Sequence, residues 1–386
     1  IMNIVIAIDS FKGCISSVDS GRLLKQAIEE VYPGDVVSVF PLADGGEGTV
    51  DAMTQGLNGR IVKVPVTGPL GTKIESRYGL LPDTNMAVIE MADASGLPLV
   101  PPEKRNPLHT TTYGLGELIL AAIDAGCRHF IIGIGGSATN DCGLGMLTAL
   151  GFRFLKADGS CAGVAGGDLA DVAQIDARQA DSRLQDCTFE IACDVTNPLC
   201  GPEGCSNVFG PQKGATREIV ARMNDDIHHF AQLAEKACGI KGQEMAGAGA
   251  AGGLGFAFHT FLHGTLTPGS ELILSAIGIK EALSKADLLV TGEGRMDKQT
   301  AMGKGPAGVA QLAKSCQPHC LTVALCGSAA RDAERINQHG IDAYFPILHA
   351  PMTLQEAMDR ATTEQNLRQT IQQVMHLIHQ TVALRA

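Results

Sequence analysis

Features that mark several other classes of protein are missing from this sequence. Tryptophan is absent and aromatic residues make up only 4% of the chain, so it lacks the stacking platforms that bind single-stranded nucleic acids. The 30 basic residues are outnumbered by 41 acidic ones, which leaves no surplus positive charge for a phosphate backbone. No apolar run reaches the ~18 residues of a membrane-spanning helix. The composition therefore argues against a nucleic-acid-binding or membrane-spanning protein.

A disulfide framework is not expected either. The 12 cysteines are scattered and none forms a CxxC pair. Cys193 and Cys326 lie inside apolar, strand-like runs, where a thiol packs as a small hydrophobic group. No signal-peptide pattern precedes the first strand. We expect free thiols and a reducing compartment, the cytoplasm.

Glycine, by contrast, is abundant, with 46 residues in a chain of 386, and this length predicts two or three domains. Short β-branched runs at residues 4–8, 36–40 and 60–66 alternate with helical patterns, which predicts a βαβαβ unit with a mostly parallel sheet. The same rhythm returns in the last hundred residues. We predict two α/β domains with mostly parallel sheets. Residues 1–68 plus 281–386 form the outer domain, and residues 69–280 form an inserted domain.

Polar, glycine-rich loops with a carboxylate follow almost every predicted strand. These loops lie at residues 9–13, 43–49, 92–96, 135–143, 193–198 and 291–300. Ligands of open α/β sheets bind beyond the carboxyl ends of the strands, and glycines there let backbone N–H groups approach an anion. Short loops also use Gly and Asp simply to turn. Six such loops with Lys12 and Arg295 among them favour a binding site.

Together these residue types suit phosphoryl transfer with ATP and Mg²⁺. That chemistry needs cations around the moving phosphate, carboxylates for Mg²⁺ and a carboxylate that takes a proton. No GxxxxGK[ST] motif and no protein-kinase signature occurs, so the chain is neither a P-loop NTPase nor a protein kinase. We expect Asp141 and Asp194 to bind the metal. The expected nucleotide-binding residues are Gly135, Gly136, Ser137, Thr139 and Asn140.

One GxGxxG match occurs at residues 247–252, but no buried strand precedes it, as a dinucleotide site would require. We predict that Gly249 and Gly252 cradle nucleotide phosphates; helix packing is an equally good explanation. His259 and His263 are spaced as metal ligands on a helix, but without an HExxH context they are interpreted as packing or surface residues.

Four of the loops together resemble the bacterial glycerate kinase family. The matching segments are residues 9–13, 43–49, 135–141 and 292–300, in the expected order, and the resemblance covers essentially the whole chain. It implies a flavodoxin-like domain, which we assign to the insert, beside an α/β domain of another fold. It also implies ATP-dependent phosphorylation of D-glycerate, with 2-phosphoglycerate as the expected product. Cys142 departs from the family pattern, where glycine is expected.

The residues themselves suggest roles for this substrate. Arg295 suits the glycerate carboxylate and Lys12 suits a phosphate. We expect further substrate contacts from the loop residues Asp9, Ser10, Asp44 and Glu293. Asp297 is the preferred general base and Asp194 the second candidate, although Asp297 also suits a helix N-cap.

Two other classes of function stay open at this stage. A nicotinamide-dependent oxidoreductase of a small hydroxy acid would carry a strand-borne GxGxxG with an acidic residue about 20 positions later. A non-catalytic two-domain protein that binds a small acid would carry a secretory signal and fewer carboxylates. We expect a small-molecule substrate and neither a nucleic-acid nor a membrane partner.

Overall fold

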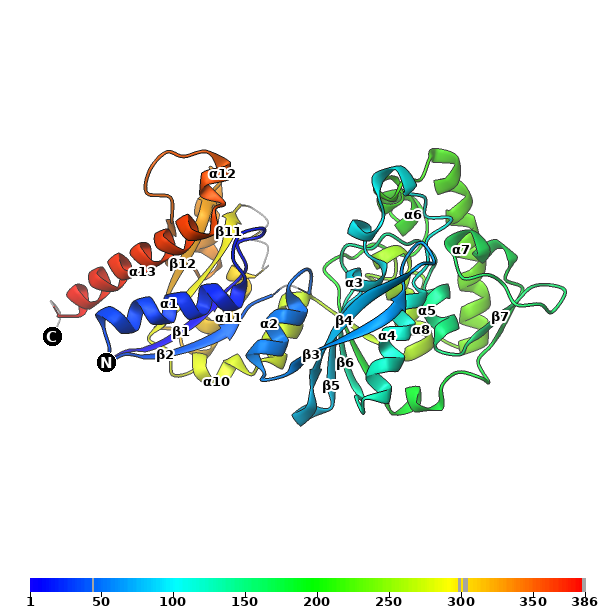
Figure 1. The fold of residues 1–386 in the computed structure, drawn as a ribbon, viewed down its shortest axis with the longest axis horizontal. Coiled ribbons are helices and arrows are strands. Elements are labelled where there is room, and N and C mark those ends of the chain that lie inside the picture. Colours follow the sequence, from blue (N-terminus) through cyan, green and yellow to red (C-terminus); the bar gives the residue numbers. More distant parts are fainter. Residues whose placement is uncertain (44, 298–299, 301–304, 384–386) are drawn as a thin grey trace. The chain divides into compact units, whose positions relative to one another are not determined.

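The computed structural model describes residues 1–43, 45–297, 300 and 305–383 (Figure 1). The chain forms two compact units. Unit 1 comprises residues 1–44, 55–57 and 270–386, and unit 2 comprises residues 45–54 and 58–269. Almost the whole of unit 2 is therefore one long insertion in the chain of unit 1.

Unit 1 is built on a five-stranded sheet in the order β13-β12-β11-β1-β2, and every neighbouring pair is parallel. Its strands are β1 (Asn3–Ile8), β2 (Val36–Pro41), β11 (Leu288–Met296), β12 (Leu321–Ala329) and β13 (Ala343–Pro346). Its helices are α1 (Ser17–Val31), α10 (Ile279–Leu283), α11 (Pro306–Cys316), α12 (Leu354–Ala357) and α13 (Arg360–Ala383), with most of α9 (Gly269–Ala276).

Helices cover both faces of this sheet, as the continuous apolar strands require. Ile4, Ile6 and Ile8 of β1 pack in one core with α1 and α13. Figure 1 shows these two helices side by side. The alternate residues of β1 point to the opposite face, where α11 contacts β1 and β11. Helix α1 starts where the Ser16 side chain accepts a hydrogen bond from the Asp19 backbone N–H, a typical N-cap.

The flavodoxin-like strand order lies in this unit. Numbered along unit 1 alone, the strands follow the order 2-1-3-4-5, which is the flavodoxin arrangement. We had expected the flavodoxin-like fold in the insert, and the strand order of flavodoxin occurs in unit 1. This order arises because β1 pairs with β2 along one edge and with β11 along its other edge. Strand β11 follows unit 2 in the chain.

Unit 2 contains a six-stranded mixed sheet in the order β10-β9-β6-β5-β4-β3. Its strands are β3 (Arg60–Thr67), β4 (Lys73–Leu81), β5 (Met86–Glu90), β6 (His129–Gly133), β9 (Thr188–Ala192) and β10 (Thr265–Thr267), and a separate pair is formed by β7 (Arg153–Leu155) and β8 (Gln174–Asp176). Strands β5, β6, β9 and β10 run parallel, whereas β3 and β4 pair antiparallel. The predicted α/β class with two mostly parallel sheets is confirmed.

The helices of unit 2 surround one large apolar core. They are α3 (Ala92–Ser95), α4 (Tyr113–Asp124), α5 (Leu144–Ala149), α6 (Cys205–Phe209), α7 (Arg217–Cys238) and α8 (Leu254–Leu262), with most of α2 (Thr49–Gly56). Short 3₁₀ turns lie at η1 (Pro82–Thr84), η2 (Leu97–Leu99), η3 (Pro102–Lys104), η4 (Gly166–Asp171), η5 (Ser182–Asp186), η6 (Pro211–Lys213), η7 (Ala250–Gly252) and, in unit 1, η9 (Ala333–His339).

The predicted place of residues 60–66 was wrong. These residues form β3, which pairs antiparallel with β4 at the edge of the unit 2 sheet and does not extend a parallel βαβαβ unit. The chain accordingly enters unit 2 at residue 45 and leaves it after residue 269, whereas we had placed these crossings after residues 68 and 280.

Gly45, the first described residue after Asp44, is held tightly against the unit 2 sheet. Its φ is +85°, and a Cβ there would lie 2.4 Å from the Cβ of Ala192. In turn, a Cβ on Gly133 would lie 2.0 Å from the Gly45 carbonyl oxygen. The backbone thus crosses the carboxyl ends of β6 and β9 at a distance that only glycine permits.

Two further observations concern the cysteines and the helices. All 12 cysteines are free thiols. Among the helices of the described residues, none combines the length and the apolar character of a membrane span.

Candidate active site

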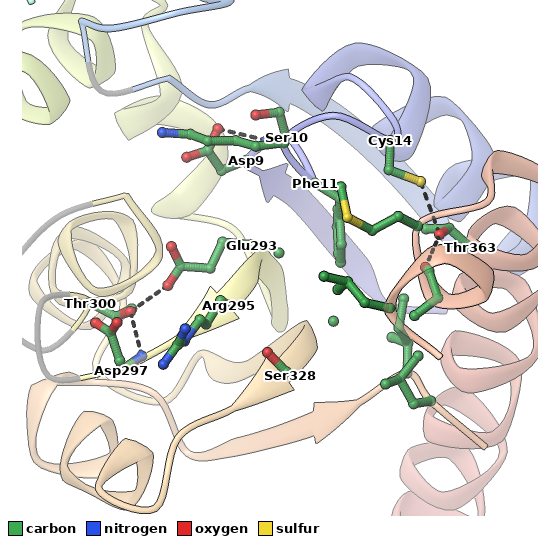
Figure 2. A pocket seen from close by; sticks show the side chains of 18 of the residues that line it. Asp9, Ser10, Phe11, Cys14, Glu293, Arg295, Asp297, Thr300, Ser328 and Thr363 are labelled. Atoms are coloured by element: carbon green, nitrogen blue, oxygen red, sulfur yellow. Dashed lines mark hydrogen bonds between the residues drawn. The ribbon is translucent and has the colours of Figure 1, made fainter. Parts of the chain in front are cut away.

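A cavity of about 570 Å³ opens at the carboxyl end of the unit 1 sheet. Most of its polar lining residues come from the loop after β1, from β11 and from the segment that follows β11, with Ser328 of β12 and Thr363 of α13 (Figure 2). Strands β1 and β11 are the neighbours between which the strand order reverses. Ligands of open α/β sheets bind at such a switch point, so the position of this cavity is the one that the topology favours.

Six of the residues predicted from the sequence meet in this cavity. They are Asp9, Ser10, Lys12, Glu293, Arg295 and Asp297. A backbone hydrogen bond from Asp9 N to Gly292 O, 2.9 Å long, ties the ends of β1 and β11 together. Gly292 has a φ of +154°, and a Cβ there would lie 2.0 Å from the carbonyl oxygen of Leu325. Glycine at this position therefore lets β11 pack on β12 while Glu293 lies next to the loop that carries Asp9.

Glu293 is the carboxyl group with the most altered chemistry in the cavity. Its pKa is raised to about 7, mainly by burial and in addition by the carboxylates of Asp9 and Asp297, while a hydrogen bond from Thr300 and the charge of Lys12 oppose the increase. The Thr300 hydroxyl donates to Glu293 Oε1 and accepts the backbone N–H of Asp297 at 3.1 Å. A carboxyl group with a pKa near neutrality exchanges a proton readily at physiological pH.

Two cations complete the charged part of the cavity. Lys12 and Arg295 both line it and both are exposed. Within the part of the chain that the structure describes, neither is held in an ion pair with a carboxylate. Both are therefore available to an anionic ligand, and the guanidinium of Arg295 offers the fork that matches a carboxylate.

The carboxylates of the cavity suit Mg²⁺ only together with a ligand. Asp9 and Asp297 raise the pKa of Glu293, which indicates a local excess of negative charge that a divalent cation would relieve. No group of three or more His, Cys, Asp or Glu side chains among the described residues is arranged to hold a metal. Mg²⁺ commonly uses only one or two carboxylates and takes its other ligands from phosphates and water, so the donor set fits an ion that arrives with a nucleotide.

In unit 2, the loop after β6 carries the predicted nucleotide-binding residues. Gly135 and Gly136 are exposed, and Ser137 is 7% exposed. Lys213 of η6 lies beneath this loop with only 2% exposure, where its Nζ donates to Ser137 Oγ at 2.7 Å and to the carbonyl oxygen of Thr139 at 2.5 Å. Burial lowers the pKa of Lys213 to about 8. This ammonium group fixes the shape of the loop.

Thr139 and Asn140 are fully buried, so their side chains cannot reach a nucleotide in this structure. Asn140 Nδ2 donates to Ser206 Oγ at 2.9 Å. In this structure both residues support the loop from below, and the binding role that we predicted for them stays a prediction. Gly135 and Gly136 are exposed, whereas Ser137 is buried, and the nucleotide-binding role of all three stays a prediction.

Asp141, which we predicted to bind the metal, accepts hydrogen bonds inside unit 2 in this structure. It is fully buried, and its carboxylate accepts hydrogen bonds from the backbone and the hydroxyl of Thr112 and from the N–H groups of Gly143 and Gly145. Burial raises its pKa, and these bonds oppose the increase. A carboxylate enclosed in this way offers no open oxygen to a cation.

Packing explains the glycines of the GxGxxG match. Gly249 and Gly252 are buried. A Cβ on Gly249 would lie 2.3 Å from the carbonyl oxygen of Pro198, and one on Gly252 would lie 2.2 Å from that of Thr139. The Gly249 N–H is also engaged by Asn197 O. We had held phosphate binding and packing to be equally good explanations, and the structure favours packing.

Cys142, the departure from the expected glycine, lies fully buried with a φ of +50°. This is left-handed backbone, which costs a residue with a Cβ more than it costs glycine. The thiol packs against Gly253. The backbone at position 142 thus has the left-handed conformation that favours glycine, although the residue there is cysteine.

Two further predicted residues remain. Asp194 is exposed after β9 in unit 2, and its Oδ1 accepts the backbone N–H of Gly269 at 2.9 Å. Its catalytic and metal-binding roles stay predictions. Asp44 lies outside the described residues.

Sequence reasoning missed several residues that shape these sites. Lys213 was missed because Pro-Gln-Lys-Gly resembles an exposed turn, and Thr300 because its partner Glu293 is seven positions away. The apolar side of the unit 1 cavity was also missed. It is lined by Phe11, Ile347, Leu348, Leu354, Ala357 and Met358.

Comparison with known proteins shows to which family this chain is related. The model of the glycerate kinase family matches residues 4–379. The glycerate kinase of Bacillus subtilis (strain 168) is 49% identical over 360 residues, which cover 93% of this chain and 94% of that protein. The glycerate 2-kinase of Escherichia coli (strain K12) is 45% identical over 92% of this chain and 93% of its own length.

A solved structure agrees with this relationship. The crystal structure of a Salmonella typhimurium LT2 protein assigned as glycerate kinase 2 superposes with a TM-score of 0.91 at 44% identity, and the match covers 99% of each chain. The resemblance of the four loops is therefore confirmed over nearly the full length of the sequence, and the chain belongs to the glycerate kinase family.

Proposed function

We propose that this protein is a glycerate kinase that transfers the γ-phosphoryl group of ATP to D-glycerate and releases 2-phosphoglycerate. Family membership supports the reaction, and the name of the Escherichia coli relative, glycerate 2-kinase, supports the position of the new phosphate. The observation that carries the proposal is the unit 1 cavity, where three carboxyl groups and two cations meet at the switch point of the sheet.

Substrate binding follows from the charges in this cavity. Arg295 binds the glycerate carboxylate through its fork of N–H donors, and Lys12 contacts a phosphate as a point charge. Asp9, Ser10 and Glu293 contact the hydroxyl groups of glycerate. Asp44 stays a predicted substrate contact.

In the chemical step, a hydroxyl oxygen of glycerate attacks the γ-phosphorus. The new O–P bond forms as the bond from phosphorus to the oxygen of ADP breaks, and the hydroxyl proton passes to a carboxylate. We assign this role to Asp297 because it lines the same cavity as Arg295, so that one segment both orients the substrate and takes its proton. Asp194 stays the second candidate.

Mg²⁺ supplies charge neutralisation at the phosphates when it is bound. Asp9 is the carboxylate of the cavity best suited to hold it, and Asp194 is the candidate in unit 2. The free thiols suit a reducing compartment, and a cytoplasmic location agrees with the use of ATP.

The test is to incubate the purified chain with ATP, Mg²⁺ and D-glycerate and to follow ADP release, with L-glycerate and glycolate as control acceptors. We expect ADP release that depends on D-glycerate, and ³¹P NMR should identify 2-phosphoglycerate. If 3-phosphoglycerate forms, the position is wrong but the kinase stands. Without ADP release, glycerate binding or glycerate-dependent reduction of NAD would indicate the binding protein or the oxidoreductase.

A further inference from the structure

The unit 1 cavity is much larger than the proposed acceptor needs. Its volume is about 570 Å³, which lies within the range that encloses a drug-sized ligand, roughly 300–1,000 Å³. Glycerate is a small three-carbon acid. A second, larger molecule must therefore account for much of this space, and under the proposed function that molecule is ATP.

The lining of the cavity divides into a charged side and an apolar side. Figure 2 shows Asp9, Glu293 and Asp297 on one side and Phe11 and Cys14 on the other. The apolar side continues with residues from the segment after β13 and from α12.

The apolar side chains are unusually accessible. Leu354 is 75% exposed, Met358 is 42% exposed and Leu348 is 37% exposed, whereas the neighbouring Phe11 and Ile347 are buried. When a flat apolar ligand covers exposed apolar side chains, apolar surface is removed from water and the free energy of the complex is lowered. Glycerate has no such surface. Adenine does, and the triphosphate of ATP carries negative charge that Lys12 of the same cavity can bind.

The topology gives independent support. The cavity lies at the carboxyl end of a sheet with the strand order 2-1-3-4-5, beside the strands β1 and β11 where the order reverses. Nucleotide-like ligands bind sheets of this order at that point.

We propose that the apolar side of the unit 1 cavity, formed by Phe11, Ile347, Leu348, Leu354 and Met358, binds the adenine ring of ATP. The inference rests on the proposed use of ATP. According to this inference the adenine ring binds to unit 1, whereas the sequence analysis predicted that loops of unit 2 bind the nucleotide.

The test is a double variant, Leu354→Asn with Met358→Asn, which removes two exposed apolar contacts and introduces no charge. Leu377→Asn is the matched control, because Leu377 is 63% exposed on α13 of the same unit and does not line the cavity. Calorimetric titration measures the binding of ADP and of inorganic tripolyphosphate. We expect ADP to bind about tenfold more weakly to the double variant, which corresponds to roughly 1.4 kcal/mol. Tripolyphosphate binding and the KM for glycerate should stay within twofold of wild type.

Two results would overturn the inference. Unchanged ADP binding in the double variant would place the base elsewhere, and so would an increased glycerate KM with normal ADP binding, because the apolar side would then contact the acceptor. Failure of the proposed function is a separate result. If no ADP is released with glycerate but ADP binding still depends on residues 354 and 358, the adenine site stands and the acceptor was wrong.

Discussion

Thr300 and Glu293 are joined by a hydrogen bond in which the Thr300 hydroxyl donates to the Glu293 carboxylate, and the same hydroxyl accepts the N–H of Asp297. One threonine thus links the buried glutamate at the end of β11 to the proposed general base. The hydroxyl donates to Glu293 Oε1, and this hydrogen bond stabilises the ionised carboxylate. It therefore lowers the pKa of Glu293, whereas burial raises it. The protonation state of Glu293 is therefore finely balanced, and this balance is measurable.

We expect the pH dependence of kcat/KM to report this balance. Because the pKa of Glu293 is raised to about 7 and its ionised form is the better acceptor for a substrate hydroxyl, kcat/KM should rise as pH increases through about 7. Glu293→Gln should lower the plateau and remove this limb of the profile. Glu334→Gln, an exposed change in η9, is the control and should retain the limb. If the rise of kcat/KM with pH persists unchanged in Glu293→Gln, the group that titrates is not Glu293.

Arg295→Lys should raise the KM for glycerate by about tenfold or more. The substitution keeps the charge but loses the paired donors, and hydrogen bonds to charged groups contribute roughly 1.5–3 kcal/mol each. Steady-state kinetics with glycerate varied at saturating ATP measures the effect. Arg22→Lys on the exposed side of α1 is the matched control. An unchanged glycerate KM in Arg295→Lys would remove Arg295 from the carboxylate site.

Asp297→Asn should reduce kcat by roughly 10²–10⁴, the usual contribution of a general base. Asparagine retains the ability to cap a helix, so a purely structural role would cost little activity and at most about 1 kcal/mol of stability. Single-turnover measurements and thermal unfolding together separate the two roles. If Asp297→Asn keeps more than about a tenth of the wild-type kcat while Asp194→Asn does not, Asp194 is the base.

Glu90→Gln should stabilise the protein above pH 7. Glu90 is 4% exposed, and burial raises its pKa to about 7, although its bond to the Val50 N–H opposes this effect. Its folded state holds the proton more tightly than its unfolded state, so Glu90 makes the free energy of unfolding fall as pH rises from about 4.5 to about 7. Glutamine keeps an acceptor for Val50 without the charge. The gain in Tm should be present at pH 8 and small at pH 4.5.

Glu117→Gln provides the contrasting variant. Burial opposes ionisation of Glu117, but bonds from Lys73 and Thr67 outweigh it and lower its pKa. This carboxylate therefore adds stability above its unfolded pKa and loses that contribution as pH falls. Its glutamine variant should lose Tm at pH 8, the opposite of Glu90→Gln. Equal shifts of the same sign in both variants would contradict the linkage argument.

The chemistry-bearing loops of unit 1 could be predicted because parallel strands end at one edge of a sheet. Asp9 follows β1 and Glu293 lies in the carboxyl-terminal half of β11, so their meeting required only that β1 and β11 pair. The burial of Asp141 could not be predicted in this way. A carboxylate in a glycine-rich loop has the same local sequence whether it faces a ligand or accepts four hydrogen bonds inside the protein, and only tertiary packing distinguishes the two.

The misplaced strand β3 did carry a signal in the sequence. Val62, Val64 and Val66 alternate with Lys63 and Pro65, a period of two that is typical of a half-buried antiparallel strand. Strand β1 instead reads as a continuous apolar run, as a buried parallel strand does. The buried Lys213 carried no such signal, because the partners that hold it, Ser137 and Thr139, are more than 70 positions away in the chain.

The insertion of unit 2 also sets the order in which the protein can fold. Strand β1 pairs with β2 on one edge and with β11 on the other, and β11 begins only at Leu288. While the ribosome synthesises the intervening residues, unit 2 can complete its own core, but the apolar strand β1 keeps one edge without a partner. Such an edge is a template for pairing with other chains. We therefore expect the nascent chain to be most prone to aggregation between the completion of β2 and the emergence of β11, a period in which binding by a chaperone would be most useful.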